Sequence, residues 1–197
     1  MYWAAKGWPS DLLQLDRELF LYLNGQGSAF MDPFWLTVTQ METWLPLFFL
    51  GVFLYFYHYP PRIAALRFGS VVVLGYGVYV VMRLTKAWVG RLRPNNQPEL
   101  EGLVRTLQNP QDFSFFSGHA ATSFALTFFV YLQLRHRYPG LILLFIWPVL
   151  FTLSRIFVGV HYPLDLVVGS GVGLLSAYLA NRLLPPDLYS SRRAQEE

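Results

Sequence analysis

Hydrophobic residues fall into five runs separated by short polar segments, a pattern typical of membrane-spanning helices. The runs cover 44–58, 64–86, 118–134, 140–157 and 164–184. A simple span needs about 20 apolar residues, and the shorter runs reach that length only through polar residues at one end. The pattern predicts an all-α fold, an integral membrane bundle of five transmembrane helices in a single domain.

The first 30 residues contain a different, amphipathic pattern. Leu12, Leu15 and Leu19 recur at helical spacing, with a helix start at Pro9-Ser10 and a stop at Asn24-Gly25. Acidic residues interrupt any continuous apolar core, so this segment does not read as a cleavable signal peptide. We expect an N-terminal amphipathic helix that lies in the membrane interface, packs on the other helices, or does both. If it crosses the membrane, the bundle has six spans.

Composition narrows the class of protein further. Hydrophobic residues make up 54% of the chain and charged residues only 14%, whereas a soluble domain carries about 25% charged residues. The chain has no cysteine, which excludes disulfides and thiolate metal sites. The net charge of +3 is spread along the chain, so a nucleic-acid partner is not indicated.

The distribution of charge predicts the orientation in the membrane. Seven basic residues belong to one side: Arg62, Arg67, Arg135, Arg137, Arg182, Arg192 and Arg193. Nine of the twelve acids belong to the other, which holds the N-terminal helix and the connection 87–117. By the positive-inside rule the basic side and the C-terminus are cytoplasmic. We expect a bacterial cytoplasmic membrane protein whose loop 87–117 covers a site facing the periplasm or the exterior.

Three cations are expected to meet at that outer end. Lys86 and Arg93 are seven residues apart, so they share one face if the helix continues through both, and Arg155 arrives from another span. Such a group suits a multiply charged anion, because arginine matches phosphate oxygens and lysine adds a point charge. Arg83 and Arg91, taken alone, are interpreted as cations that extend toward lipid headgroups.

Two further stretches contribute titratable groups at the same level. In Ser117-Gly118-His119 the serine can cap a helix whose first N–H groups point at an anion. His161 and Asp165 are four residues apart around a proline, so the carboxylate can orient the imidazole and leave its second nitrogen as a nucleophile. Each feature alone also fits a purely structural role.

In this order the stretches resemble the type 2 phosphatidic acid phosphatase superfamily. Its pattern of K-x6-R-P, P-S-G-H and S-R-x5-H-x3-D is matched by Lys86 to Pro94, Phe116 to His119 and Ser154 to Asp165. The one departure is Phe116 where the family often has proline, at a position that carries no chemistry. The superfamily also contains soluble vanadium haloperoxidases, but the predicted spans favour its integral-membrane phosphatase branch.

The resemblance implies a role for each residue. His161 attacks phosphorus and becomes a phosphohistidine, Asp165 orients it, and His119 protonates the leaving oxygen and then activates water. The residues that hold the phosphoryl oxygens are Lys86, Arg93, Ser117, Gly118 and Arg155. No carboxylate cluster offers a metal site in the sequence, so neither a metal nor another cofactor is expected, and the cations take the place of a metal.

The expected function is a membrane lipid phosphatase that takes its lipid phosphate substrate laterally from the bilayer, with no obligatory protein partner. We favour undecaprenyl diphosphate phosphatase. The alternatives are phosphatidylglycerophosphate, phosphatidic acid or lipid A phosphatase. A reading of a different class is an inactive lipid-binding scaffold, against which the complete set of His119, His161 and Asp165 argues.

Overall fold

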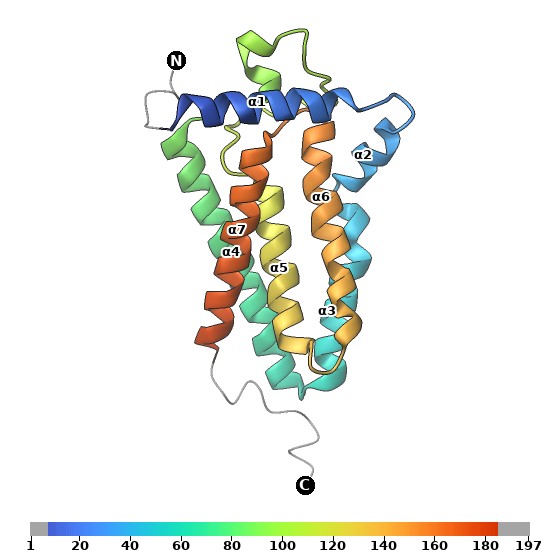
Figure 1. Cartoon of the computed structure of the whole chain (residues 1–197). Coiled ribbons are helices and arrows are strands. Elements are labelled where there is room, and N and C mark those ends of the chain that lie inside the picture. Colours follow the sequence, from blue (N-terminus) through green and yellow to red (C-terminus); the bar gives the residue numbers. More distant parts are fainter. Residues whose placement is uncertain (1–7, 185–197) are drawn as a thin grey trace.

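The computed structural model describes residues 8–184. Every element of regular secondary structure in this range is a helix, and the range contains no strand. Helices α3 to α7 run lengthwise in a bundle, and α1 lies across one end of it (Figure 1). The α-helices are α1 Ser10–Gly25, α2 Asp32–Val38, α3 Leu45–His58, α4 Pro61–Val89, α5 Gly118–Leu134, α6 Ile146–Phe157 and α7 Pro163–Leu183. The all-α prediction is confirmed. The prediction of a single domain over 1–197 stays a prediction.

The number of spans is only partly resolved. The helical segments Pro61–Leu100, Pro139–Phe157 and Pro163–Leu183 are long and apolar enough to cross a membrane. The segment Asp32–Val38 with Glu42–His58 adds a fourth span if this pair, bent by 71°, is counted as one. Within residues 8–184 three to four candidate spans are therefore found, and the expected count of five or six is not confirmed. Helix α5, with 17 residues, is short for a span.

Local sequence explains where the long helices begin and end. Pro61 and Pro163 start α4 and α7, where the missing N–H of proline costs nothing. The Ser117 hydroxyl accepts the Ala120 N–H at 3.4 Å and so caps α5. Helix α4 stops at Gly90, whose φ of 67° is a left-handed conformation favoured by glycine. The first three residues of the predicted loop 87–117 are therefore helical.

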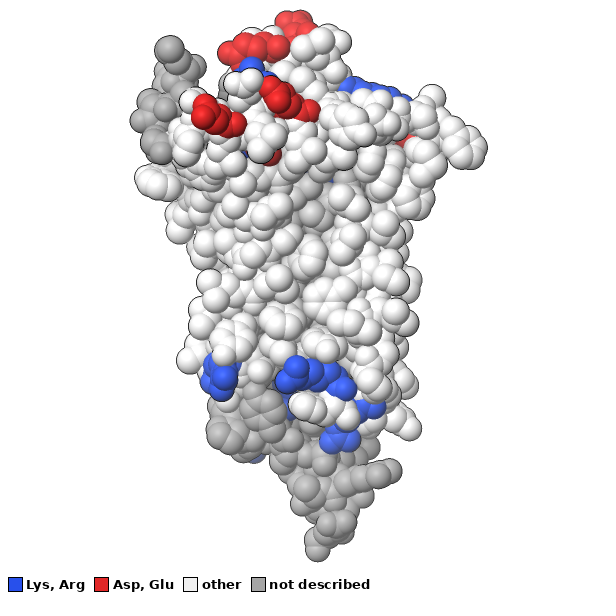
Figure 2. Space-filling view, viewed as in Figure 1, with Lys and Arg blue, Asp and Glu red and all other residues white. Residues whose placement is uncertain are grey.

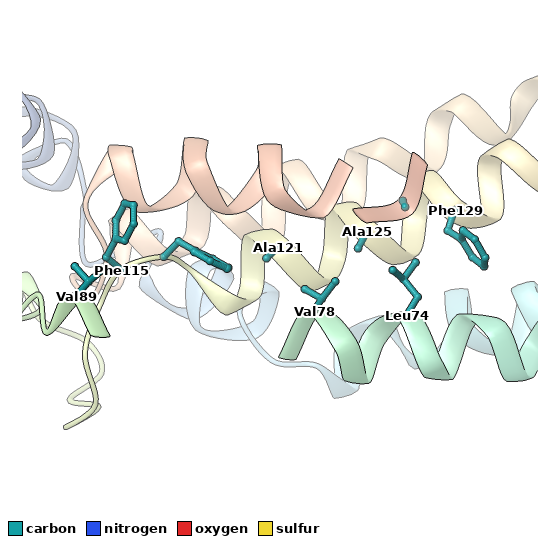
Figure 3. Packing of buried hydrophobic residues seen from close by; sticks show 9 residues of the cluster. Leu74, Val78, Val89, Phe115, Ala121, Ala125 and Phe129 are labelled. Atoms are coloured by element: carbon teal, nitrogen blue, oxygen red, sulfur yellow. The ribbon is translucent and has the colours of Figure 1, made fainter. Parts of the chain in front are cut away.

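Helix α5 forms the centre of the bundle, between α4 and α7 (Figure 3). Small residues on α5, Ala121 and Ala125, face Val78 and Leu74 of α4 in a buried apolar cluster. On the α7 side the contact is closer, because Gly169 and Gly173 lie against the backbone of α5. A Cβ atom at Gly169 would stand 2.7 Å from the Ser117 carbonyl oxygen. The two helices that carry His119 and Asp165 are thus held backbone to backbone.

Helix α1 has the predicted bounds and two distinct faces. Asp16, Phe20 and Asn24 are buried against the bundle. Leu12, Leu15, Leu19 and Tyr22, in contrast, are exposed on the outside. Packing on the other helices is confirmed. The exposed leucines leave insertion into the membrane interface as a prediction that fits the geometry.

Charged residues gather at the two ends of the molecule (Figure 2). In this view the acidic side chains lie at the end that carries α1, together with a few basic ones, the opposite end shows basic side chains alone, and a long band without charged side chains separates the two ends. The exposed cations at the second end include Arg62, Arg135, Arg137 and Arg182. Arg67, also predicted on the cytoplasmic side, is buried and donates to Gln133 Oε1 at 2.8 Å. The last two predicted cytoplasmic cations, Arg192 and Arg193, lie outside the described residues.

Candidate functional site: a cationic cluster near the N-terminal helix

The predicted cations Lys86 and Arg93 meet at a third residue, Asp112. Lys86 Nζ lies 2.6 Å from Asp112 Oδ2, and Arg93 Nη2 lies 2.7 Å from Oδ1. Arg93 Nε also donates to the Asp112 carbonyl oxygen at 2.9 Å. The condition under which Lys86 and Arg93 would share one helix face is not met, because α4 ends before Arg93, which is extended. The left-handed Gly90 turns the chain so that both cations still reach the same carboxylate.

Asp112 supplies both of these cations with an anionic partner. Two carboxylate oxygens face an ammonium and a guanidinium, in the arrangement that favours phosphate binding. Burial raises the pKa of Asp112, but the hydrogen bond from Lys86 and the charges of Lys86 and Arg93 outweigh it, bringing the pKa to about 2. Asp112 is therefore an anion at neutral pH. Sequence reasoning missed it, because no local pattern ties it to the motifs.

The histidine and the carboxylate predicted to act together are in contact. His161 Nδ1 lies 3.2 Å from Asp165 Oδ2, and both side chains are buried. Arg93 Nη1 lies 3.0 Å from His161 Nε2. Because guanidinium can only donate, Nε2 is the acceptor and the imidazole proton sits on Nδ1, toward Asp165. Burial, and after it the charges of Arg93, Arg155 and Lys86, hold the pKa of His161 well below its ordinary value of 6.5.

Arg155 reaches the site from α6. Its Nη1 donates to the Thr39 hydroxyl and, at 2.9 Å, to Gln108 Oε1. Its Nε is buried and has no hydrogen-bond partner among the described residues. The Arg155 carbonyl oxygen accepts the N–H groups of Val160 and His161, at 3.1 and 3.3 Å. Thr39 and Gln108 were not foreseen, since they lie in segments without a motif.

The start of α5 brings the remaining predicted residues to the same end. The Ser117 N–H donates to the Asp165 carbonyl oxygen at 3.0 Å, which places Gly118 and the first turn of α5 beside the start of α7. The His119 ring packs on Phe151, with 4.6 Å between the ring centres. Phe151 is one helical turn before Arg155 on α6.

Arg91 is the clearest correction to the sequence reading. Its side chain is only 6% exposed, so it does not extend toward headgroups. Arg91 Nη1 donates to Asp165 Oδ1 at 2.7 Å, and Nη2 donates to Asp16 Oδ2 at 2.6 Å. Arg83, by contrast, is exposed on α4 as expected. Two features of the sequence could have indicated this ion pair. Arg91 is two residues before the motif residue Arg93, and Asp16 is an acid of α1 that lies outside the row of its exposed leucines.

The arrangement suits phosphoryl transfer. It combines a neutral imidazole oriented by a carboxylate, a second histidine at a helix start, and three cations. Within residues 8–184 no group of three His, Cys, Asp or Glu side chains is placed to hold a metal ion.

A family model described as the PAP2 superfamily matches residues 64–187. The chain belongs to the PAP2 superfamily. It is therefore an integral membrane protein and a lipid phosphatase, a hydrolase of phosphoester bonds, as the sequence predicted. The matched region includes every motif residue described above.

Among curated proteins, a lipid A 4'-phosphatase of Porphyromonas gingivalis is 28% identical over 87% of this chain and 74% of that protein. A putative undecaprenyl-diphosphatase of Escherichia coli, YbjG, is 31% identical over 59% of this chain and 61% of that protein. The names of these two relatives specify different substrates.

Two solved structures share the fold. The Aquifex aeolicus LpxE crystal structure has a TM-score of 0.69 and 25% identity, covering 85% of this chain and 95% of that one. A PAP2-type phosphatidylglycerolphosphate phosphatase from Bacillus subtilis has a TM-score of 0.71, over 88% of this chain and 86% of that one, and shows the fold alone because its identity is 19%.

Proposed function

We propose that this PAP2 phosphatase hydrolyses a phosphate monoester of a lipid A-type glycolipid and releases inorganic phosphate. The observation that carries the proposal is the match to the Porphyromonas gingivalis lipid A 4'-phosphatase, which extends over 87% of the chain. This replaces undecaprenyl diphosphate as the favoured substrate, because the match to YbjG covers a smaller share of the chain.

The position of the site supports a lipid substrate. The group of cations lies at one end of the bundle, on the side that carries α1, whose outer face has exposed leucines. A phosphorylated headgroup can bind there while its acyl chains remain in the bilayer. The clustering of basic residues at the opposite end supports a site on the periplasmic or exterior side.

The proposed reaction has two balanced steps. His161 Nε2 attacks phosphorus, the bond from phosphorus to the sugar oxygen breaks, and His119 gives that oxygen its proton. Water then attacks the phosphohistidine, His119 takes a proton from the water, and phosphate leaves with restoration of His161. Lys86, Arg93 and Arg155, with Ser117 and the Gly118 N–H, stabilise the charge on the equatorial oxygens.

For Nε2 to attack, Arg93 must exchange its contact with that nitrogen for a contact with the phosphate. In the described structure Arg93 Nη1 donates to the lone pair of Nε2. Asp112 forms ion pairs with Lys86 Nζ and with Arg93 Nη2. Substrate binding therefore replaces one set of ion pairs by another, which limits its electrostatic cost.

Undecaprenyl diphosphate remains a second candidate, because YbjG is the more identical relative over the aligned region. The test is phosphate release by detergent-purified protein from a panel of lipid A bisphosphate, undecaprenyl diphosphate, phosphatidylglycerophosphate and phosphatidic acid. We expect the highest kcat/KM with lipid A, and a product that mass spectrometry identifies as the monophosphate. A higher kcat/KM with undecaprenyl diphosphate would move the assignment to the second candidate. Hydrolysis of none of the four would reject the proposed function.

A further inference from the structure

A chain of buried polar contacts runs from Asp165 away from the phosphate-binding cations and ends on α1. Asp165 Oδ2 faces His161 Nδ1 and accepts the Tyr162 N–H at 3.0 Å. Its other oxygen accepts from Arg91, which donates in turn to Asp16. The side chains of Arg91, Asp16 and Asp165 are 6%, 4% and 0% exposed. Both oxygens of Asp165 are thereby fixed in direction.

Asp16 also touches the helix that carries Asp165. Its Oδ1 accepts the Leu164 N–H at 2.8 Å, so a side chain from α1 binds an open donor in the first turn of α7. The Arg91 guanidinium lies 3.8 Å from the ring centre of Tyr162, and that ring packs against Phe20 of α1. Arg91 therefore has its position set by two carboxylates and an aromatic face.

The charges in this chain match the proposed reaction. Within this chain of contacts, two carboxylates and one guanidinium leave one net negative charge on the Nδ1 side of His161, opposite the cations at Nε2. During attack the neutral imidazole becomes a positively charged phosphoimidazolium, which that charge stabilises where water is excluded. A buried ion pair of this kind is costly to form and is poor evidence for stability alone, so its placement behind His161 favours a role in the reaction.

We propose that Arg91 and Asp16 are positioning residues, which hold Asp165 so that His161 keeps its proton on Nδ1 and presents Nε2 to phosphorus. The inference rests on the proposed phosphatase mechanism. It means that α1 contributes to the geometry of the site through Asp16. The competing view is that Asp16 and Arg91 only attach α1 to the bundle.

The experiment compares Asp16→Asn, Arg91→Gln and Arg91→Lys with the wild-type protein, using lipid A bisphosphate and orthovanadate. We expect kcat to fall roughly 10- to 100-fold in Asp16→Asn and Arg91→Gln, the usual effect of losing a group that orients a ligand or base, with KM within about twofold. Arg91→Lys keeps one charged contact and should recover part of kcat. Inhibition by vanadate, which binds through His161 as a five-coordinate mimic, should weaken, whereas inhibition by inorganic phosphate should not change.

Asn24→Ala supplies the matched control for attachment of α1. The Asn24 amide donates to the carbonyl oxygens of Ile156 and Arg105, at 2.9 and 3.1 Å, without touching Asp165. We expect this variant to lower the unfolding temperature and leave kcat unchanged. An equal fall of kcat in Asn24→Ala and Asp16→Asn, or an unchanged kcat in Asp16→Asn and Arg91→Gln, would overturn the proposal.

Nuclear magnetic resonance of ¹⁵N-histidine decides the point even if no lipid is hydrolysed. Wild-type His161 should show a single neutral form protonated on Nδ1, and Arg91→Gln should mix the two neutral forms. Identical His161 spectra in the two proteins would also overturn the inference. Absence of lipid hydrolysis by the wild-type protein, with the expected His161 spectra in both proteins, would instead reject the proposed function and leave this inference standing.

Discussion

Asp112 Oδ2 lies 2.6 Å from Lys86 Nζ, and its second oxygen binds Arg93. The carboxylate therefore occupies two of the cations that the proposed mechanism assigns to the substrate phosphate. Its pKa of about 2 keeps it charged throughout the usual assay range.

Replacing this carboxylate should therefore tighten anion binding. The Asp112 side chain is 42% exposed, and a partly exposed ion pair contributes about 0.2–1 kcal/mol. We expect Asp112→Asn to bind inorganic phosphate up to about fivefold more tightly, measured as competitive inhibition. Glu101→Gln, an exposed acid of the same loop, serves as control. Unchanged or weaker inhibition in Asp112→Asn would show that Asp112 does not occupy the place of phosphate.

The two histidines should fail in different ways. His161→Ala should abolish turnover and leave no acid-quenched phosphoenzyme. His119→Ala should lose less activity with a nitrophenyl ester, whose leaving group needs no proton, since general acid help is worth about 10²–10⁴-fold. Phosphohistidine should then accumulate, because its hydrolysis still needs a base. Labelled phosphohistidine in His161→Ala would reverse the assignment.

The state of His161 gives a pH-dependent prediction. Its pKa is held below 6.5, so protonation begins only at lower pH than for a free imidazole. At pH 6.5 an unperturbed histidine is half protonated, whereas ¹⁵N spectra should show His161 neutral. Folding stability linked to this residue should be intact above pH 6.5 and decline as the pH falls below it, because the unfolded chain takes up the proton first. A His161 signal that titrates at 6.5 or above would contradict the structure.

Chelation should leave activity intact, since the proposed mechanism binds the phosphate through Lys86, Arg93 and Arg155 and not through a metal ion. Phosphate release should continue in EDTA at its original rate, and orthovanadate should inhibit it. Activity lost in EDTA and recovered with magnesium would refute the cation-based mechanism.

Labelling of single cysteines checks the orientation, and the chain has no native cysteine to interfere. Glu101 is exposed at the end of the molecule near α1, and His136 is exposed in the turn after α5 at the other end. A membrane-impermeant reagent applied to intact cells should label Glu101→Cys and spare His136→Cys. Labelling of His136→Cys alone would invert the topology.

Sequence spacing was sufficient to predict contacts within a motif, but not between distant segments. His161 and Asp165 are four residues apart, so their contact follows from local geometry. The pairing of Arg91 with Asp16 joins positions 75 residues apart, and neither segment carries a pattern that names the other. Asp112 escaped notice for the same reason. Hydropathy predicted the helices well, including the bounds of α1. It could not predict which face of α1 packs on the bundle, because the buried residues Asp16, Phe20 and Asn24 are mostly polar.

The close contact of α5 and α7 has a consequence for natural variation. Because Gly169 and Gly173 leave no space for a Cβ atom, an alanine or valine at either position would force the two backbones apart. Such a change leaves the apolar character of α7 nearly intact, so the chain would still be recognised and inserted as a membrane protein. A lineage can thus lose the catalytic geometry through one methyl group while every charged residue of the site is preserved.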